Sequence, residues 1–188
     1  MDIILLRHGE TLDNISKVFG RDDTVLSEAG KKEVLNIKKI LDSYDYEYVY
    51  NSPLLRVKQT MELLDIKGED RPELKEYNFG IFTGYTYKEI LKNYPEETKS
   101  WVKNPLRYEI PEGDNLEDKF NQLSDFLNKI SQKDENVLLV AHAGIIQLAM
   151  CWAFDNLDYF YKFKVDTASI SVITVRKKFK YINQLNIK

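Results

Sequence analysis

The two histidines of this chain of 188 residues each follow an apolar stretch that is typical of a buried strand. His8 comes after a four-residue apolar run and Arg7, while His142 comes directly after residues 137–141. A third predicted strand leads into a helix that carries Arg56 near its start. Imidazoles act as nucleophiles and proton carriers, and guanidinium groups match phosphate oxygens in pairs. Together these side chains predict a site for a phosphate dianion.

A metal centre is the competing interpretation of the same side chains, because histidines and carboxylates can bind zinc or iron. The sequence contains no HExxH pair, and an arginine next to His8 repels a cation. A phosphate-binding P-loop is also missing, because Val25 stands where that motif requires a glycine. Cys151 lies in an apolar helical pattern, which favours a core position over a nucleophile. We therefore expect no metal at this site.

The elements that must position these residues follow from the apolar pattern. Short apolar runs alternate with helical patterns, which predicts an α/β fold with a largely parallel sheet. Ligands bind beyond the carboxyl ends of the strands in such sheets, where both histidines are expected. The expected strands cover residues 3–6, 46–50, 137–141, 169–176 and 179–185, the last two as a hairpin or strand pair. One expected helix covers residues 54–65. Another begins after Ser27, which is its expected N-cap, and its apolar face is expected to consist of Leu35, Ile37, Ile40 and Leu41.

Aromatic side chains are concentrated between residues 77 and 108, where eight of 32 residues are aromatic against 12% in the whole chain. The pattern there is mostly helical, with breaks at Pro95 and Pro105. Two interpretations remain open. The segment is either an aromatic helical unit that packs on the sheet, or a cap over a pocket with some aromatic rings facing the ligand.

Composition limits the class of protein. The net charge is −3, which argues against a nucleic-acid partner, since backbone binding needs a basic face. The single cysteine excludes a disulfide within the chain. The longest apolar stretch, residues 143–154, is too short for a membrane span, and the N-terminus does not resemble a signal peptide. We expect one domain and a soluble, cytoplasmic protein without a membrane or nucleic-acid partner.

Five ordered sequence blocks carry a family resemblance. Residues 6–11, LRHGET, resemble the signature of the histidine phosphatase superfamily, which includes the cofactor-dependent phosphoglycerate mutases. Asn14 follows at the family spacing. The other four blocks are residues 19–30 (FGRDDTVLSEAG), 52–60 (SPLLRVKQT), 74–80 (LKEYNFG) and 140–144 (VAHAG). The resemblance covers nearly the whole chain.

The resemblance implies a fold and a reaction. The fold is a three-layer α/β sandwich, with a mostly parallel central sheet flanked by helices and a helical cap insertion at about 77–112. The whole chain, 1–188, is then a single histidine phosphatase domain. The reaction is a two-step phosphoryl transfer through a phosphohistidine, which needs no metal and no organic cofactor.

The resemblance also implies roles for particular residues of this chain. His8 matches the nucleophile, and Glu76 matches the general acid that protonates the leaving oxygen and then activates water. Arg7, Arg56 and His142 match the phosphate-pocket residues that stabilise developing charge. Further substrate contacts are expected from Asn14, Gly20, Thr24 and the backbone at Ala143.

The chain departs from the family pattern in two places. Val25 replaces a proline that is common in the second block. Residues 111–115, PEGDN, occupy the place where many relatives have PxGES, so substrate contacts made by that glutamate and serine are not carried over.

The expected substrate is a small phosphate ester. Only about 30 residues separate Gly84 from Gly113, which is short for the carboxylate-gripping segment of the family's mutases, so hydrolysis is favoured. Residues 78–90 and Trp101 resemble α-ribazole-5′-phosphate phosphatases of cobalamin biosynthesis, which makes α-ribazole 5′-phosphate the best guess. The alternatives are a broad-specificity sugar or nucleotide phosphatase and a phosphoglycerate mutase. A different class is a phosphohistidine-protein phosphatase or phosphopeptide-binding module. The sequence makes no prediction of oligomeric state.

Overall fold

A single six-stranded sheet with the order β3-β2-β4-β1-β5-β6 organises the chain in the computed structural model, which describes residues 1–177 and 179–188. The pairs β1–β4, β4–β2 and β2–β3 are parallel, whereas β5 and β6 add two antiparallel pairs. The sheet is therefore mixed but mostly parallel, as the sequence predicts. The strands are β1 (Asp2–Arg7), β2 (Tyr48–Asn51), β3 (Glu69–Asp70), β4 (Val137–Ala141), β5 (Ile170–Arg176) and β6 (Phe179–Ile187).

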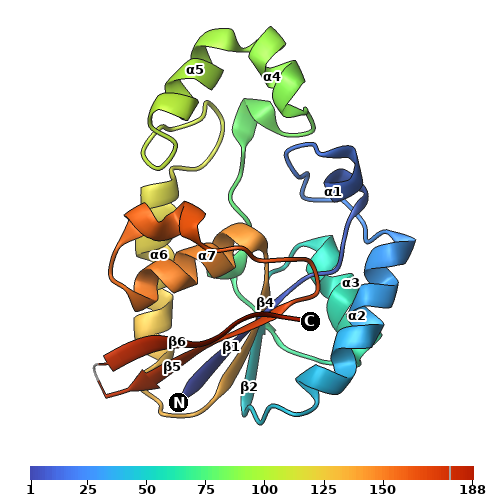
Figure 1. Cartoon of the computed structure of the whole chain (residues 1–188), viewed down its shortest axis with the longest axis vertical. Coiled ribbons are helices and arrows are strands. Elements are labelled where there is room, and N and C mark those ends of the chain that lie inside the picture. Colours follow the sequence, from blue (N-terminus) through green and yellow to red (C-terminus); the bar gives the residue numbers. More distant parts are fainter. Residues whose placement is uncertain (178) are drawn as a thin grey trace.

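Helices cover both faces of this sheet, so the architecture has three layers (Figure 1). Alternate residues of β1 point to opposite faces, because side chains alternate along a strand. Ile4 and Leu6 join the core under α2 and α3, whereas Ile3 and Leu5 join the core under α6 and α7. The helices are α1 (Leu12–Ser16), α2 (Glu28–Leu41), α3 (Leu55–Leu64), α4 (Tyr87–Asn93), α5 (Pro95–Lys103), α6 (Leu116–Ile130) and α7 (Ala143–Ala153). The 3-10 helices are η1 (Pro72–Leu74), η2 (Gly80–Phe82) and η3 (Leu157–Lys162).

The start of α2 confirms one sequence prediction, and its apolar face corrects another. The Ser27 hydroxyl accepts a hydrogen bond from the Gly30 N–H at 2.9 Å, so Ser27 is the N-cap. Leu35, however, is 51% exposed, while Val34 is fully buried. The buried positions of α2 follow a spacing of three to four residues that places Leu35 on the solvent side.

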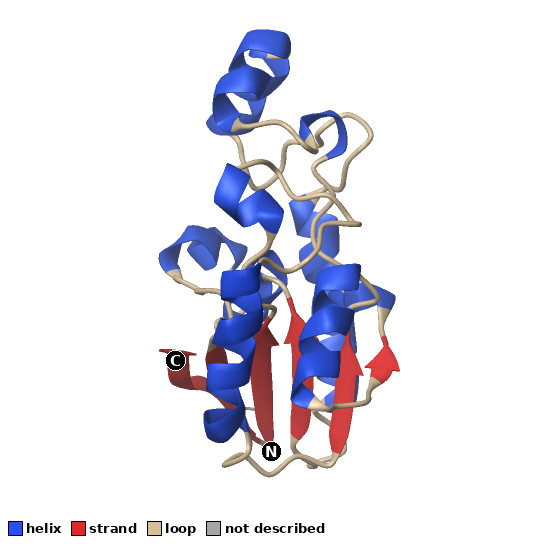
Figure 2. Ribbon diagram, turned by 90° about the vertical axis from the view of Figure 1, so that its right-hand side faces the viewer, coloured by secondary structure: helices blue, strands red, loops and turns tan. Residues whose placement is uncertain are grey.

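The cap consists of η2, α4 and α5 and stands beyond the carboxyl ends of the parallel strands (Figure 2). Pro95 occupies the first turn of α5, where its missing N–H costs no hydrogen bond, so the chain breaks just before it as expected. Phe82 and Ile90 are fully buried and fix the cap to the rest of the core. The segment places an aromatic lobe over the edge of the sheet where the histidines lie.

Helix α7 is the most apolar helix and lies in the core, with eight of its eleven residues buried. Cys151 is among them, and burial together with Asp158 raises the pKa of its thiol to about 12. This thiol is a core group, as the sequence predicts. Among the described residues, none of the helices combines the length and the apolar character needed to cross a membrane.

Candidate active site

Three neighbouring strands bring the predicted phosphate ligands to one edge of the sheet. Strand β1 ends at Arg7 and is followed by His8, while β4 is followed by His142. Arg56 is the second residue of α3, which follows β2, so it lies near the start of its helix as expected. The rings of His8 and His142 are 5.2 Å apart between centroids. Arg56 Nε lies 3.2 Å from Nδ1 of His142. The predicted residues therefore form one cluster.

The hydrogen bonding of His8 defines which ring nitrogen is free. Its Nδ1 lies 2.7 Å from the carbonyl oxygen of Gly9, which can only accept, so Nδ1 carries the proton. The lone pair is then on Nε2. Burial lowers the pKa of His8 well below its ordinary value of 6.5, and the charges of Arg7 and Arg56 lower it further. His8 is consequently a neutral imidazole with an available nitrogen.

His142 is held on both sides of its ring. Nδ1 accepts from Arg56 Nε, so the proton is on Nε2, which donates to the Ser52 hydroxyl at 2.7 Å. The ring is fully buried. Burial lowers the pKa of His142 well below 6.5, and Arg56 and His8 add to the shift. The arrangement orients Arg56, which also donates from Nη1 to the Arg21 carbonyl at 2.9 Å.

Arg7 is only partly paired within the protein. Nη1 donates to the Val165 carbonyl at 2.7 Å, while the buried Nε has no hydrogen-bond partner among the described residues. Burial lowers the pKa of Arg7, and the nearby carboxylates of Glu76, Asp166 and Glu33 oppose that shift. A buried donor without a partner is costly, so this N–H is available for a phosphate oxygen.

Glu76 reaches the same place from the loop after η1. Its Oε2 accepts from the Gly144 N–H at 3.3 Å, and its Oε1 accepts from the Tyr77 N–H at 3.1 Å. A Cβ on Gly144 would lie 2.6 Å from Oε1 of Glu76. Because Gly144 has no side chain, the Glu76 carboxylate can approach the N-terminus of α7.

The four expected substrate-contact residues have different surroundings in the structure. Asn14 fixes the start of α1, since its Oδ1 accepts from the Thr11 N–H at 3.0 Å, which leaves its N–H₂ group free to donate elsewhere. Gly20 has open space where a Cβ would stand. Ala143 is the first residue of α7, so its N–H has no partner inside the helix. Thr24 is buried, and its side chain helps to lower the pKa of the Asp13 carboxyl group.

Asp13 is a structural residue that the sequence did not single out. It is 1% exposed and forms an ion pair with Arg21, whose backbone N–H also donates to Oδ2 of Asp13 at 2.8 Å. Burial alone raises the pKa of Asp13, but hydrogen bonds from Arg21 and Thr24 outweigh it and lower the pKa. The pair fixes the Arg21 carbonyl that receives Arg56 Nη1.

A cavity of about 310 Å³ adjoins Glu76 and the start of α7. Its lining includes aromatic rings from the cap and from the segments before and after it, and Gln147 adds an amide. Glu76 is the single charged side chain in the described lining. The aromatic lining residues are Phe19, Tyr77, Phe79, Trp101, Phe160 and Tyr161. The interpretation of the aromatic segment as a cap over a pocket therefore agrees with the structure.

A sequence model of the histidine phosphatase superfamily (branch 1) matches residues 3–188. The chain belongs to this superfamily. The match confirms the resemblance carried by the five motif blocks. Proteins named as phosphatases occur both among the sequence relatives and among the similar solved structures. This chain is therefore a phosphatase of the histidine phosphatase superfamily.

Sequence relatives of this histidine phosphatase carry different substrate names. Phosphoserine phosphatase 1 of Hydrogenobacter thermophilus is 30% identical over 195 residues, covering 98% of this chain and 92% of that protein. The 6-phosphofructo-2-kinase/fructose-2,6-bisphosphatase of Arabidopsis thaliana is 31% identical over 82% of this chain. This chain spans only 21% of that longer protein.

Solved structures similar to this histidine phosphatase confirm the predicted fold. A putative alpha-ribazole-5′-P phosphatase from Escherichia coli superposes with a TM-score of 0.92 at 24% identity, covering 99% of this chain and 96% of the other. The alpha-ribazole phosphatase from Shigella flexneri gives 0.90 at 25% identity, with the same coverage of both chains. Both structures cover the cap as well as the sheet.

Several residues at the site were missed from the sequence. Ser52 lies inside a quoted motif and directly after β2, so its position at a strand end was an available signal. Thr60, one turn after Arg56, accepts from the Gly9 N–H at 3.3 Å and donates to the Arg56 carbonyl at 2.8 Å. The turn that contains Val165 carries no motif, so nothing in the sequence placed it against Arg7.

Proposed function

We propose that this protein hydrolyses small phosphate monoesters through a covalent phosphohistidine on His8. The observation that carries this proposal is the neutral His8 ring, with its proton fixed on Nδ1 by the Gly9 carbonyl and its Nε2 lone pair available. Two guanidinium groups, of the half-buried Arg7 and the buried Arg56, stand beside it as phosphate ligands. Their positive charges also oppose binding of a metal cation, so the proposed reaction is independent of metal.

In the first step, the Nε2 lone pair of His8 forms a bond to phosphorus while the bond to the ester oxygen breaks. Arg7 and Arg56 hold the non-reacting oxygens, and the amide of Asn14 and the N–H of Ala143 supply further donors. The reactive form has Glu76 protonated, and this proton passes to the leaving oxygen. The products of this step are the free alcohol and phosphohistidine.

In the second step, Glu76 is a carboxylate and accepts a proton from water. The water oxygen bonds to phosphorus as the P–N bond breaks, which returns a neutral His8 and releases inorganic phosphate. His142 contributes by holding Arg56, because both of its ring nitrogens are engaged by Arg56 and Ser52. Each residue ends the cycle in the protonation state in which it began.

Our best guess for the substrate is α-ribazole 5′-phosphate. The cavity beside Glu76 supports it, because aromatic walls suit a flat base and the lining has no lysine or arginine side chain among its described residues. A leaving group that carries a second phosphate, such as one released from a sugar bisphosphate, would find no matching cation in the described lining. The names of two similar structures support the same choice. The alternatives are a broad-specificity sugar or nucleotide phosphatase and a phosphoglycerate mutase.

The test is a panel of phosphate esters assayed without added metal. It compares kcat/KM for α-ribazole 5′-phosphate, phosphoserine, 3-phosphoglycerate, sugar phosphates, nucleotides and p-nitrophenyl phosphate. A preference of several orders of magnitude for the riboside supports the pathway-specific enzyme, and a flat profile supports the generalist. Conversion of 3-phosphoglycerate to its 2-isomer without phosphate release identifies a mutase. Efficient dephosphorylation of a phosphohistidine protein, with poor turnover of every small ester, identifies the signalling class instead.

A further inference from the structure

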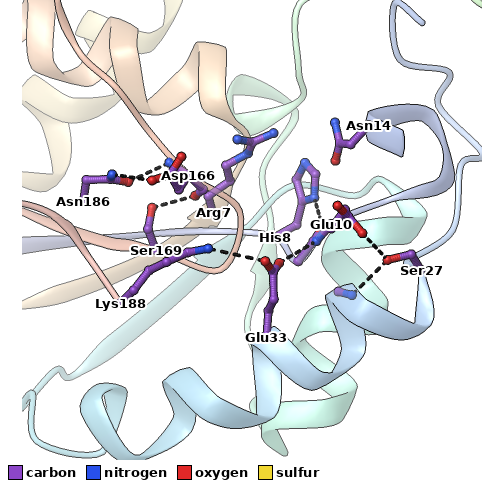
Figure 3. Close-up of polar contacts among 12 residues, drawn as sticks. Arg7, His8, Glu10, Asn14, Ser27, Glu33, Asp166, Ser169, Asn186 and Lys188 are labelled. Carbon is purple, nitrogen blue, oxygen red and sulfur yellow. Dashed lines mark hydrogen bonds and ion pairs between the residues drawn. The ribbon is translucent and has the colours of Figure 1, made fainter. Parts of the chain in front are cut away.

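The last strand of the sheet reaches the back of the phosphate site through one side chain. Asn186 of β6 makes two hydrogen bonds with Asp166: its Oδ1 accepts from the Asp166 N–H at 2.6 Å, and its Nδ2 donates to Oδ2 at 2.8 Å (Figure 3). This two-bond pair fixes both the backbone and the side chain of Asp166. It joins the strand to the turn formed by residues 165–169.

That turn makes hydrogen bonds with Arg7 and His8. The Val165 carbonyl accepts from Nη1 of Arg7 at 2.7 Å, and the Ser169 carbonyl accepts from the Arg7 backbone N–H at 3.1 Å. The Ala168 N–H donates to the His8 carbonyl at 3.0 Å. The turn therefore fixes the backbone of both residues, and it fixes the direction of one guanidinium.

The conformation of Asn186 is adapted to this contact. Its φ angle is +57°, in the left-handed region that asparagine tolerates better than most residues. The pairing of β5 with β6 shifts register at this end of the strand. Bulges of this kind redirect a side chain. The Asn186 N–H donates to the Ser171 hydroxyl at 3.0 Å, and this bond fixes the backbone of Asn186.

We propose that Asn186 is a positioning residue for the reaction, acting through the turn at residues 165–169 to aim the Arg7 guanidinium at the phosphate. This inference rests on the proposed function, because it assumes that Arg7 binds phosphate. The path is Asn186 to Asp166, Asp166 to Val165 along the backbone, and Val165 to Arg7. The buried Nε of Arg7, which has no hydrogen-bond partner in the part of the chain that the structure describes, is the group whose direction depends on this path.

A second contact at the end of the strand provides a contrast. Lys188 Nζ lies 3.3 Å from Glu33 Oε1, and Glu33 Oε2 accepts from the Glu10 N–H at 3.2 Å. The side chains of Lys188 and Glu33 are 46% and 31% exposed, and exposed ion pairs contribute little. Lys188 thus leads through Glu33 to the loop after β1, and among the described residues its side chain makes no hydrogen bond or ion pair with the turn at residues 165–169.

The experiment replaces Asn186 by glycine, which accepts the positive φ angle but removes the amide. Asn186→Gly is expected to lower kcat/KM for p-nitrophenyl phosphate about tenfold and to raise the inhibition constant of inorganic phosphate by a similar factor. The matched controls are Asn183→Ala, at an exposed position of the same strand, and Lys188→Ala. Both controls should retain wild-type values. A loss confined to Tm, with phosphate inhibition unchanged, would overturn the proposal.

A double-variant comparison tests whether the effect passes through Arg7. In an Arg7→Lys background the fork that binds the Val165 carbonyl is gone, so adding Asn186→Gly should change kcat/KM by less than twofold. A full additional tenfold loss would mean that Asn186 acts by another route. Asp166→Ala provides a second variant if Asn186→Gly does not fold, because it removes the oxygen that accepts from Asn186 Nδ2. Loss of a carboxylate near Arg7 would by itself favour phosphate binding, so weaker phosphate inhibition in this variant would come from the lost contact.

Failure of this inference is distinguishable from failure of the proposed function. Binding of inorganic phosphate to the wild type and to Asn186→Gly is measured by calorimetry, which needs no turnover. Weaker phosphate binding by the variant supports the inference even if another substrate class proves correct. Equal binding by both proteins overturns it while leaving the phosphohistidine mechanism intact.

Discussion

At the scale of single residues, the state of His8 decides the chemistry. Its Nδ1 proton is bound by the Gly9 carbonyl, and burial with two nearby arginines keeps the ring neutral. A buried neutral imidazole would elsewhere be a core residue. Here it stands beside two guanidinium groups, and that combination is what a nucleophile for a phosphate dianion requires.

His8→Ala is expected to abolish turnover, since no other described side chain at the site offers an imidazole nitrogen whose lone pair is free to attack phosphorus. The measurement is kcat with p-nitrophenyl phosphate, together with trapping of acid-labile phosphoenzyme by rapid quench. Wild type should show the labelled intermediate. Phosphoenzyme persisting in His8→Ala would refute the assignment of the nucleophile.

The lowered pKa values of His8 and His142 predict the pH dependence of stability. Between the folded pKa and the ordinary value of 6.5, the unfolded chain binds more protons than the folded chain. The free energy of unfolding should therefore rise with pH across that window and lose this contribution as the pH falls below 6.5. Urea titrations at pH 5 and pH 7 measure it. The pH dependence should shrink in His142→Gln, and an unchanged dependence would contradict it.

Glu76→Gln tests the proposed proton donor without changing the proposed phosphate ligands. The amide keeps the shape but cannot donate a proton to the leaving oxygen, so esters of poor leaving groups should slow by about 10²–10⁴-fold. For p-nitrophenyl phosphate, whose leaving group needs little protonation, formation of phosphohistidine should change far less. The burst rate with each ester is the measurement. Equal losses on both esters would argue against protonation of the leaving group.

At the scale of elements, the N-terminus of α7 connects strand β4 of the sheet to Glu76, the proposed general acid. Strand β4 ends at Ala141, and the chain turns at His142 into a helix whose Gly144 N–H binds Glu76. This strand-to-helix junction thus supplies the His142 ring, the Ala143 N–H, which has no partner inside the helix, and the Gly144 N–H, which binds the Glu76 carboxylate. The close approach of Glu76 to Gly144 makes this junction sensitive to a single methyl group.

Gly144→Ala should separate stability from activity. Alanine favours the helix by about 0.4–1 kcal/mol, so Tm should stay equal or rise. Its Cβ would meet Oε1 of Glu76 at 2.6 Å, so the carboxylate must move and kcat for poor leaving groups should fall. Thermal unfolding and ester kinetics on one preparation test both halves. A variant with normal kinetics would show that the position of Glu76 is not restrictive.

At the scale of the whole molecule, the cap and the sheet share one cavity. Phe19 joins them, since its ring lies 4.8 Å from that of Phe79 and 5.6 Å from that of Trp101, centroid to centroid. The Phe19 N–H donates to the Tyr85 carbonyl at 2.9 Å. The loop after α1 therefore closes the space between the phosphate ligands and the aromatic lobe, and the leaving group is expected there.

Trp101→Ala tests the cavity as a recognition element. Removing one aromatic wall should lower kcat/KM for an aromatic riboside phosphate by about 10–100-fold, which matches the loss of one stacked ring. Ethyl phosphate, whose leaving group does not reach the wall, should be hydrolysed at the wild-type rate. Tyr87→Ala, an exposed position of the cap, is the control. A uniform loss on both esters would reduce the role of Trp101 to packing.

The sequence by itself determined the alternating elements and the main site residues. Apolar runs located β1, β4 and the β5–β6 pair, because buried strands need continuous or alternating apolar side chains. The histidines at strand ends, with the motif arginines, predicted the cluster that the structure brings together and that we propose as the phosphate site. Periodicity misplaced Leu35, and the two-residue strand β3 was missed because so short a strand leaves no pattern.

Only the tertiary structure decided how those residues work together. Contacts that no local pattern encodes fix three features of the site. These are the proton position on His8, the hydrogen bond between Glu76 and the Gly144 N–H, and the hydrogen bonds at both His142 ring nitrogens. The bond from Arg7 to the Val165 carbonyl spans 158 positions of the chain. Local sequence sets strands, helices and caps through short-range periodicity, whereas the direction of a guanidinium depends on chain segments that meet only when the sheet is assembled.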